Sequence, residues 1–155
     1  MTARAGLPAG ARLREAAARD AGRIRSLILR VGINPTRLHW SRFLLAVDEE
    51  DRLLGCGQVK PHEDGTQELA SIAVRPAWRK KGVASAIIAE LQGRHSPPLW
   101  LTCRSSLTGF YVRFGFEEVR PPEAMPGYFA KVVRLARIAR WFTSGEYLAV
   151  MVWRG

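Results

Sequence analysis

The sequence predicts a mixed α/β domain built around one central sheet. Segments with strand character alternate along the chain with segments whose apolar residues recur at helical spacing. The 155 residues, 47% of them hydrophobic, are enough to bury the core of one domain. We expect this single domain over residues 11–155, after a flexible tail over residues 1–10, where Pro8 lies between two glycines.

The first half of the chain predicts a strand, a helix and a run of strands. Asp20 is placed to cap a helix whose apolar residues follow at helical spacing and which Gly32 ends. A hairpin follows, with an acidic turn over residues 48–51 and with Gly55 and Gly57 as expected bulge points. The expected elements are a strand over 12–16, the helix after Asp20, a short helical piece over 38–41, and strands over 43–47, 53–60 and 68–74.

The second half predicts two helices and three strands, joined by one long connection. The expected elements are a helix over 83–91, a strand over 99–103, a short helix between Ser106 and Gly115, and strands over 116–119 and 147–153. The connection over residues 121–146 is amphipathic. Its apolar side is expected to hold Val132, Leu135, Ala139 and Phe142, and its basic side Arg134, Arg137 and Arg140.

The net charge of +10 and the pI near 10.8 predict attraction to polyanions or phosphorylated cofactors, or else a solvated basic surface. Cys56 and Cys103 lie in apolar segments with no CxxC spacing and no clustered histidines, so neither zinc nor any other metal site, nor a disulfide scaffold, is expected. Free thiols, the lack of a signal-peptide core and the lack of a long uncharged apolar run favour the cytoplasm.

The segment Arg79–Ala84 has the physical properties of an anion site. It joins an expected strand to an expected helix and contains two lysines and one glycine. The positive end of the helix dipole, free backbone N–H groups and basic side chains would all face the bound anion. The segment matches neither the GxxxxGK[ST] phosphate loop nor the GxGxxG dinucleotide motif, and it forms a shorter cradle.

These residues carry a resemblance to a known family. Arg79-x-x-Gly82-x-Ala84 is preceded by Ile72-Ala73-Val74-Arg75-Pro76 and followed by Phe110-Tyr111-x-x-Phe114-Gly115-Phe116. With the opening Leu13-Arg14-Glu15-Ala16, the chain resembles the Gcn5-related N-acetyltransferases (GNAT) over nearly all of residues 13–153. The resemblance implies a mostly antiparallel central sheet with splayed middle strands, flanked by helices.

The resemblance also implies acetyl-CoA as co-substrate. Main-chain N–H groups of the loop would wrap its pyrophosphate, and the strand before the loop would bind its pantetheine arm. Arg104 stands where many members carry an asparagine that binds this arm, so Thr102, Ser105 or Ser106 is expected to replace that contact. The residues expected to bind acetyl-CoA are Ile72, Ala73, Val74, Arg79, Lys80, Lys81, Gly82, Val83, Ala84, Ser85, Thr102 and Ser106.

Two residues are expected to carry the chemistry. Tyr111 matches the tyrosine that often protonates the departing thiolate, although a purely packing role is the alternative. Glu68 is the favoured base, against a plain surface role, and His62 and His39 are less favoured. A backbone N–H near Ser71 or Ile72 would stabilise the oxyanion. Cys103 is not expected to be a nucleophile, because the family transfers the acetyl group directly.

We therefore expect an N-acetyltransferase acting on a primary amine. A small amine or amino acid is favoured, since residues 68–74 resemble N-acetylglutamate synthase domains, and a protein amine is left open. The basic residues of 121–146 would then select an acidic acceptor, or form a solvated or membrane-surface helix face. The rival function is a catalytically inactive basic module that binds nucleic acid or another polyanion. Against it, the sequence lacks the pattern of exposed aromatic and basic residues on strands that stacks on single-stranded nucleic acid. The family is often dimeric.

Overall fold

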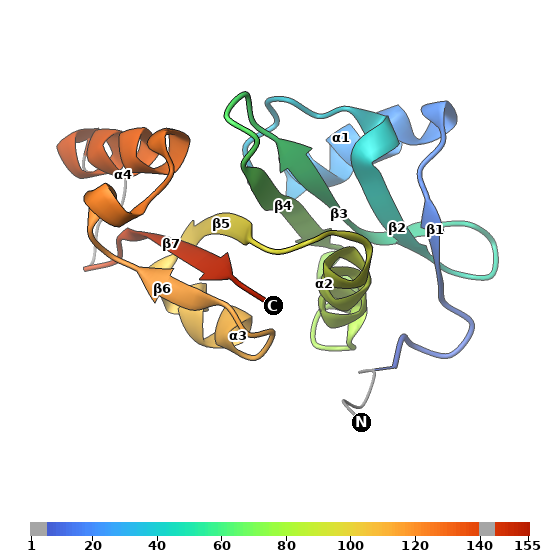
Figure 1. The fold of residues 1–155 in the computed structure, drawn as a ribbon. Coiled ribbons are helices and arrows are strands. Elements are labelled where there is room, and N and C mark those ends of the chain that lie inside the picture. Colours follow the sequence, from blue (N-terminus) through green and yellow to red (C-terminus); the bar gives the residue numbers. More distant parts are fainter. Residues whose placement is uncertain (1–5, 140–144) are drawn as a thin grey trace. The chain divides into compact units, whose positions relative to one another are not determined.

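The computed structural model describes residues 6–139 and 145–155. This part of the chain contains seven strands, mostly antiparallel, together with α-helices, so the predicted mixed α/β fold class is confirmed (Figure 1). The described residues divide into two units, one of residues 6–60 and 69–94, the other of residues 61–68, 95–139 and 145–155.

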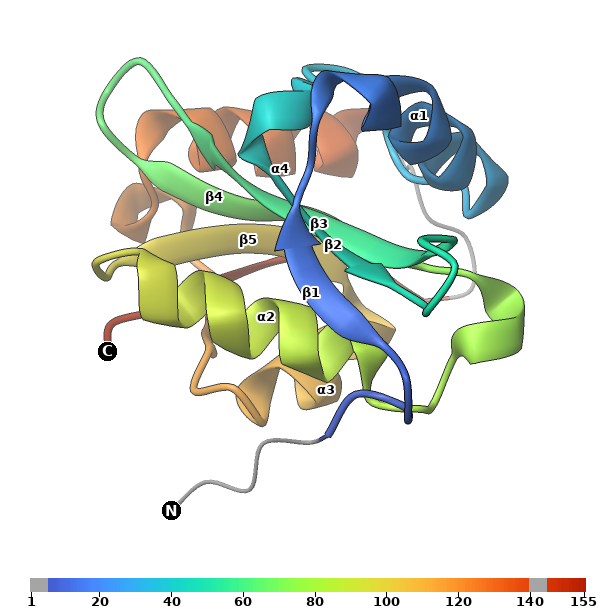
Figure 2. The ribbon, with the colours of Figure 1, turned by 90° about the vertical axis from the view of Figure 1, so that its right-hand side faces the viewer.

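The first unit is an antiparallel sheet between two helices. Its strands are β1 (Arg12–Glu15), β2 (Phe43–Val47), β3 (Leu53–Pro61) and β4 (Gln67–Val74), and its helices are α1 (Ala21–Arg30) and α2 (Val83–Arg94). Strand β2 pairs with β1 on one side and with β3 on the other, both antiparallel. Figure 2 shows α1 and α2 on opposite faces of these strands.

Alternation along β3 assigns its residues to the two faces. Cys56 joins the core cluster that holds Ile24, Leu27 and Ile28 of α1. A Cβ added to Gly57 would lie 2.5 Å from Ile72 and 2.8 Å from Ile87 of α2, so this glycine lets α2 approach the sheet. The register shift of the β2–β3 hairpin pairs Ala46 with Gly55 and Val47 with Leu53, so the extra residue lies on β3 beside Gly55, as predicted, whereas this pairing is regular at Gly57.

Asp20 lies at the N-terminal end of α1 as predicted, but its carboxylate makes no side-chain cap bond to that helix. It is fully buried, accepts a 2.7 Å hydrogen bond from the Ala17 amide, and is bound by Arg14 and Arg23. Asp51, in the turn between β2 and β3, binds the same two arginines. The network therefore ties β1, α1 and the turn together.

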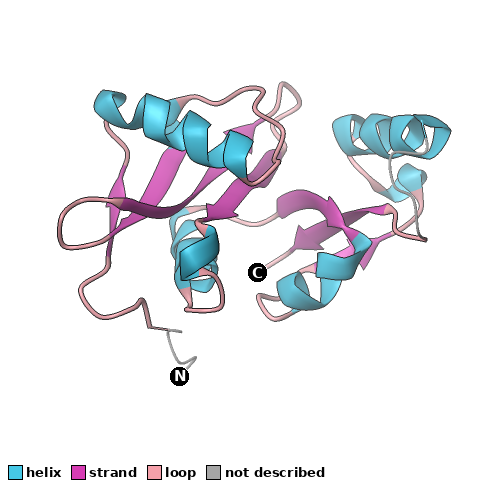
Figure 3. Cartoon of the chain, turned by 180° about the vertical axis from the view of Figure 1, so that it is seen from behind, coloured by secondary structure: helices cyan, strands magenta, loops and turns pink. Residues whose placement is uncertain are grey.

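The second unit is a smaller sheet with a helix on each face (Figure 3). Its strands run in the order β5-β7-β6, all antiparallel, and the start of β4 pairs in parallel with β5 at Glu68↔Trp100. The elements of this unit are β5 (Leu99–Arg104), α3 (Thr108–Val112), β6 (Glu117–Val119), α4 (Gly127–Ala139) and β7 (Leu148–Trp153). A 3₁₀ turn over Ser105–Leu107 precedes α3, so Ser106 does not cap that helix.

Helix α4 forms within the long connection but buries a different face from the predicted one. Its buried residues are Phe129, Ala130, Val133 and Ala136. Leu135 is instead 47% exposed, and Ala139 is exposed. The prediction began its apolar count at Val132 and therefore missed Phe129, which sets the face by packing against Trp100 of β5. Arg140 and Phe142 lie outside the described residues. No helix in the described ranges is both long and apolar enough to span a membrane.

Candidate active site

The basic loop lies at the surface of the first unit, between β4 and α2. Arg79, Lys80 and Lys81 are exposed, and the Lys81 ammonium lies 5.1 Å from the centroid of the Trp78 ring. Lys80 and Gly82 both have left-handed backbone conformations, with φ of 61° and 85°. Alternating handedness of this kind turns successive N–H groups toward one point and forms a concavity that suits an anion.

Helix α2 begins directly after this loop. The Ala86 amide donates to the Gly82 carbonyl over 3.0 Å, which fixes the first turn of the helix. The N–H groups of that turn have no carbonyl within the helix to bind, and the helix dipole adds positive potential there. Because Val83 is buried against β3, this end of the helix is held in place while the lysines remain in solvent.

Strand β4 contains an irregularity at Ser71. This serine is buried and has a φ of 58°, which is uncommon for a residue with a side chain and strained within a strand. The side chain of Ile72 packs over Gly57 on the α2 face. Ile72, Ala73 and Val74 then continue β4 toward the basic loop. Within this unit, the residues predicted to bind the pantetheine arm therefore lead directly into those predicted to bind the pyrophosphate.

Gln58 of β3 lies beside Ser71. Its Nε2 donates to Ser71 Oγ over 2.9 Å, and the whole residue is buried. Its Oε1 has no hydrogen-bond partner among the described residues. Because Ser71 can satisfy only one end of the amide, the other end stays unpaired in either orientation of the group.

Tyr111 of α3 lies in an aromatic cluster of the second unit. Its ring packs edge-on against Phe110 at 5.1 Å and Phe116 at 6.0 Å between centroids. Burial raises the pKa of the Tyr111 phenol, and the nearby Cys103 raises it further. The phenol therefore holds its proton at neutral pH, as a general acid must. Thr102 of β5 is half-buried, and Ser106 is exposed.

Ser105 already makes hydrogen bonds to Tyr147, the residue that precedes β7. Its Oγ accepts a 3.2 Å hydrogen bond from the Tyr147 amide, and its own amide donates to the Tyr147 carbonyl over 2.9 Å. Arg104 lies 3.6 Å from the Glu146 carboxylate. Of the three candidates for the missing asparagine contact, Thr102 and Ser106 therefore remain the better ones.

Glu68 and His62 form a buried pair. His62 Nε2 lies 2.9 Å from Glu68 Oε1, and their side chains are only 5% and 7% exposed. Glu68 is thus no surface strand residue, and His62, the less favoured base, is buried beside it. The turn over residues 62–66, between β3 and β4, brings the two together, with the His62 amide donating to the Thr66 carbonyl over 2.8 Å. His39, by contrast, is exposed and bonded to Ser41.

Helix α4 covers this pair with aromatic rings. Tyr128 stacks on the His62 imidazole with 4.1 Å between centroids and 27° between planes. Phe129 meets the same imidazole edge-on at 5.7 Å and also packs on Trp100. Tyr128 is itself 37% exposed.

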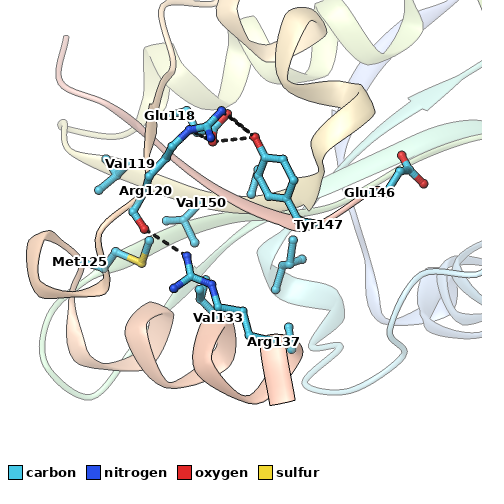
Figure 4. Close-up of a pocket in the computed structure, with 12 residues that line it drawn as sticks. Glu118, Val119, Arg120, Met125, Val133, Arg137, Glu146, Tyr147 and Val150 are labelled. Atoms are coloured by element: carbon cyan, nitrogen blue, oxygen red, sulfur yellow. Dashed lines mark hydrogen bonds and ion pairs between the residues drawn. The ribbon is translucent and has the colours of Figure 1, made fainter. Parts of the chain in front are cut away.

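A cavity of about 410 Å³ lies between α4, β6 and the start of β7 (Figure 4). Its polar side is a network in which Arg120 donates to the Tyr147 hydroxyl, which hydrogen-bonds to Glu118, and this bond raises the pKa of Tyr147. Arg137 points into the cavity and donates to the Arg120 carbonyl over 3.4 Å. Arg134 and Arg137 are both exposed, but of the two only Arg137 lines this cavity, so the structure separates two arginines that the sequence grouped together.

Both cysteines are free thiols. Burial raises the pKa of Cys56 to about 12, and burial together with the charge of Glu118 raises the pKa of Cys103 to about 12. Both thiols therefore favour the protonated, less nucleophilic form at neutral pH. Among residues 6–139 and 145–155, no three His, Cys, Asp or Glu side chains are grouped to hold a metal ion.

Sequence reasoning missed one feature of the first unit, the unpaired amide of Gln58, and two of the second, the burial of His62 and the packing of Tyr128 and Phe129 against it. The hairpin offered one usable signal, because His62 and Glu68 flank its turn and face each other across it. The other two depend on contacts between segments far apart in the sequence, for which spacing gives no signal.

The sequence was compared with protein-family models and with curated proteins. The model of the acetyltransferase (GNAT) domain matches residues 39–118, slightly more than half of the chain. The matched range includes Glu68, the basic loop and Tyr111. No curated protein matches the chain.

Solved structures share the fold at low sequence identity. N-acetylglutamate synthase from Neisseria gonorrhoeae, complexed with coenzyme A and N-acetyl-glutamate, is 20% identical with a TM-score of 0.68. The match covers 92% of this chain and 35% of that one, so the chain spans about a third of the Neisseria enzyme. Rv2747 from Mycobacterium tuberculosis, in complex with CoA, is 19% identical with a TM-score of 0.67, covering 90% of this chain and 97% of that one.

A third structure, a GNAT-family acetyltransferase from Staphylococcus aureus, is 12% identical with a TM-score of 0.63. It matches 90% of this chain over 97% of its own length. At these identities the likenesses show a common fold.

Proposed function

The chain belongs to the GNAT acetyltransferase family, and we propose that it is an acetyl-CoA-dependent N-acetyltransferase that transfers acetyl directly to a primary amine. The observation that carries the proposal is the loop over Arg79–Ala84. Two left-handed residues, a helix N-terminus and three exposed cations meet there, in the family's motif position. Each of these properties favours a multiply charged anion such as a pyrophosphate.

We assign the acetyl-CoA contacts as follows. Residues 79–85 bind the pyrophosphate through backbone N–H groups, with the lysines adding charge. Ile72, Ala73 and Val74 bind the pantetheine arm through their backbone, and Thr102 and Ser106 supply polar contacts near it. The two solved relatives that contain coenzyme A support this choice of ligand at the level of the fold.

When bound, acetyl-CoA supplies an acetyl thioester, and the chain supplies proton transfer and charge stabilisation. Glu68, hydrogen-bonded to His62, is the base that removes a proton from the acceptor's ammonium group. A backbone N–H at Ser71 or Ile72 donates to the carbonyl oxygen as the C–N bond forms. The raised pKa of Tyr111 keeps its proton available at neutral pH, so that it can protonate the departing sulfur. The amine nitrogen releases its second proton as the C–N bond forms and the C–S bond breaks, and this balances the proton lost by Tyr111.

The acceptor is a small amine or an amino acid in this proposal, with a protein amine as the alternative. The N-acetyl-glutamate found with the Neisseria synthase supports an amino acid. Arg137 is the described residue of the basic connection that points into a cavity, so it is the residue we assign to an acidic acceptor.

Thermal denaturation with acetyl-CoA tests the proposal directly. A ligand present at a hundred times its Kd stabilises the folded state by about 2.7 kcal/mol, so a clear rise in Tm is expected. Pantetheine, which lacks the pyrophosphate, is the matched control and should stabilise far less. A screen of amines, amino acids and peptides for release of the CoA thiol then identifies the acceptor. No stabilisation by acetyl-CoA, with stabilisation by an oligonucleotide instead, would favour the rival binding module.

A further inference from the structure

The cavity between α4, β6 and the start of β7 has a largely apolar lining. Val133, Ala136 and Val150 are buried, and Val119 and Met125 are partly buried against the core of the second unit. Because most of these residues belong to that core, the cavity is formed before any ligand binds. Its volume of about 410 Å³ is in the range of small-molecule sites.

Three polar side chains that line the cavity are bound to one another. Tyr147 donates to the Glu118 carboxylate over 2.9 Å. Arg120 lies 3.0 Å from the same carboxylate through Nε and donates to the Tyr147 hydroxyl over 3.1 Å. Glu146, which also lines the cavity, lies 3.6 Å from Arg104. Each of the two carboxylates in the lining therefore already has a cationic partner.

Arg137 is the cation of the lining that has no such partner. Its guanidinium donates to the Arg120 carbonyl over 3.4 Å, and it forms no ion pair with a carboxylate of residues 6–139 or 145–155. Figure 4 shows it reaching from α4 toward Arg120. A guanidinium holds five N–H donors in a planar fork, which matches the two oxygens of a carboxylate. The cavity therefore combines one unpaired positive charge with an apolar lining.

The cavity lies on the same face of its sheet as Thr102. Val150 pairs directly with Thr102 of β5, and directly opposite residues of antiparallel strands project to the same face. Trp100, two residues earlier in β5, packs against Phe129 of α4, so this is the face that α4 covers. A ligand in the cavity is thus one strand away from a residue that we assign to acetyl-CoA.

We propose that this cavity selects the acceptor, and that the acceptor is an amino acid with one carboxylate and an apolar side chain. The inference rests on the proposed function and narrows its acceptor. The carboxylate binds Arg137, and the side chain covers the apolar lining. A second carboxylate, as in glutamate, would meet Glu118 and Glu146 with no unpaired cation left to bind it. The C–N bond forms as the C–S bond breaks, which gives an N-acetyl amino acid and the CoA thiol and releases one proton to solvent.

Three acceptors and two variants test this assignment. In the wild-type protein, kcat/KM should be at least about 10-fold higher for L-phenylalanine than for L-glutamate or for phenethylamine, which is phenylalanine without its carboxylate. Arg137→Gln should raise KM for L-phenylalanine about 30-fold with kcat within about twofold, because charge-assisted hydrogen bonds are lost. The same variant should leave KM for phenethylamine unchanged. Arg134→Gln, exposed on the same helix but outside the lining, is the matched control.

A wild-type protein that binds acetyl-CoA but prefers L-glutamate, or does not acetylate L-phenylalanine, would overturn the proposal. An unchanged KM for L-phenylalanine in Arg137→Gln would overturn it too. Thermal denaturation with and without acetyl-CoA shows that each variant is folded and binds the co-substrate. Failure of the wild-type protein to bind acetyl-CoA would instead contradict the proposed function itself.

Calorimetric titration with N-acetyl-L-phenylalanine in the presence of CoA gives a readout that needs no turnover. The wild-type protein and Arg134→Gln should bind this product equally, and Arg137→Gln should bind it about 30-fold more weakly. Equal affinity in all three proteins would refute the role of Arg137.

Discussion

The basic loop over Arg79–Ala84 and the buried pair of His62 and Glu68 are built in opposite ways. The loop is exposed, lies within six consecutive residues, and owes its anion-binding character to backbone N–H groups. The pair is almost excluded from solvent and depends on a turn, on β5 and on α4 for its position. One site needs only local conformation, and the other needs long-range packing.

This difference determines how each site can be recognised and damaged. A local backbone site leaves a motif in the sequence and is disrupted by changes in conformation or charge at one residue. A packed polar pair leaves no motif, and it is sensitive to loss of a hydrogen bond anywhere in its surroundings. The predictions below test this contrast.

Gly82→Asp should have the largest effect, because it changes the proposed pyrophosphate site in the basic loop itself. It places a side chain and a negative charge at a residue with φ of 85°, where the anion is proposed to bind. Acetyl-CoA affinity should fall by at least about 100-fold, the loss of more than 2.7 kcal/mol of binding free energy. Isothermal titration measures it. Gly32→Asp, at a φ of 76° with open space around it, is the matched control and should bind normally.

Tyr111→Phe tests the proposed general acid, a residue of the family motif that is half-buried in the structure. Removing the phenolic proton should lower kcat about 100-fold and leave the Kd for acetyl-CoA within about twofold. Steady-state kinetics and titration together separate the two effects. Unchanged turnover in Tyr111→Phe would leave this tyrosine with a packing role only.

Asp20→Asn tests how much a buried carboxylate and its ion pairs contribute to stability, at a residue with no proposed catalytic role. Breaking its ion pairs with Arg14 and Arg23 should lower the free energy of unfolding by about 3 kcal/mol. The hydrogen bonds from Arg14 lower the pKa of Asp20 in the folded state. Its contribution is therefore complete above the ordinary aspartate pKa of about 4 and is lost as the pH falls below that value.

Urea unfolding at a series of pH values measures this dependence. The wild-type protein should lose stability between about pH 5 and 2 more steeply than Asp20→Asn, because the variant lacks the titrating group. Equal slopes would mean that the carboxylate is not held as the structure shows. Arg52→Gln is a surface control: its exposed ion pairs with Asp48 and Glu50 should contribute less than about 1 kcal/mol.

Gln58→Met should have the smallest effect and the opposite sign. The amide oxygen of Gln58 is buried without a partner, which is unfavourable by about 1–3 kcal/mol, and methionine has a similar shape without that group. The variant should gain about 1 kcal/mol of stability and a Tm higher by about 2–4 °C. Ser71→Ala, which removes the partner of the other end, should destabilise. A less stable Gln58→Met would show that the oxygen is satisfied in solution.

Much of the fold was predictable because its signals are local. The β2 strand begins and ends where predicted, and the helix after the basic loop begins at Val83 as expected. The roles of individual residues were less predictable. Gly55 and Gly57 serve close packing of α2 against the sheet, and Phe129 sets the buried face of α4. Both depend on which segments meet in space, and single-sequence periodicity does not contain that information.

By itself, the sequence determined the family, the fold class and the position of the basic loop, because backbone conformation and charge over a few residues define them. Only the tertiary structure decided that His62 is buried against Glu68, that α4 covers them with Tyr128, and that Gln58 has an unpaired oxygen. Those features are set by burial. Burial depends on every segment that packs around a residue, and most of those segments are distant in the chain.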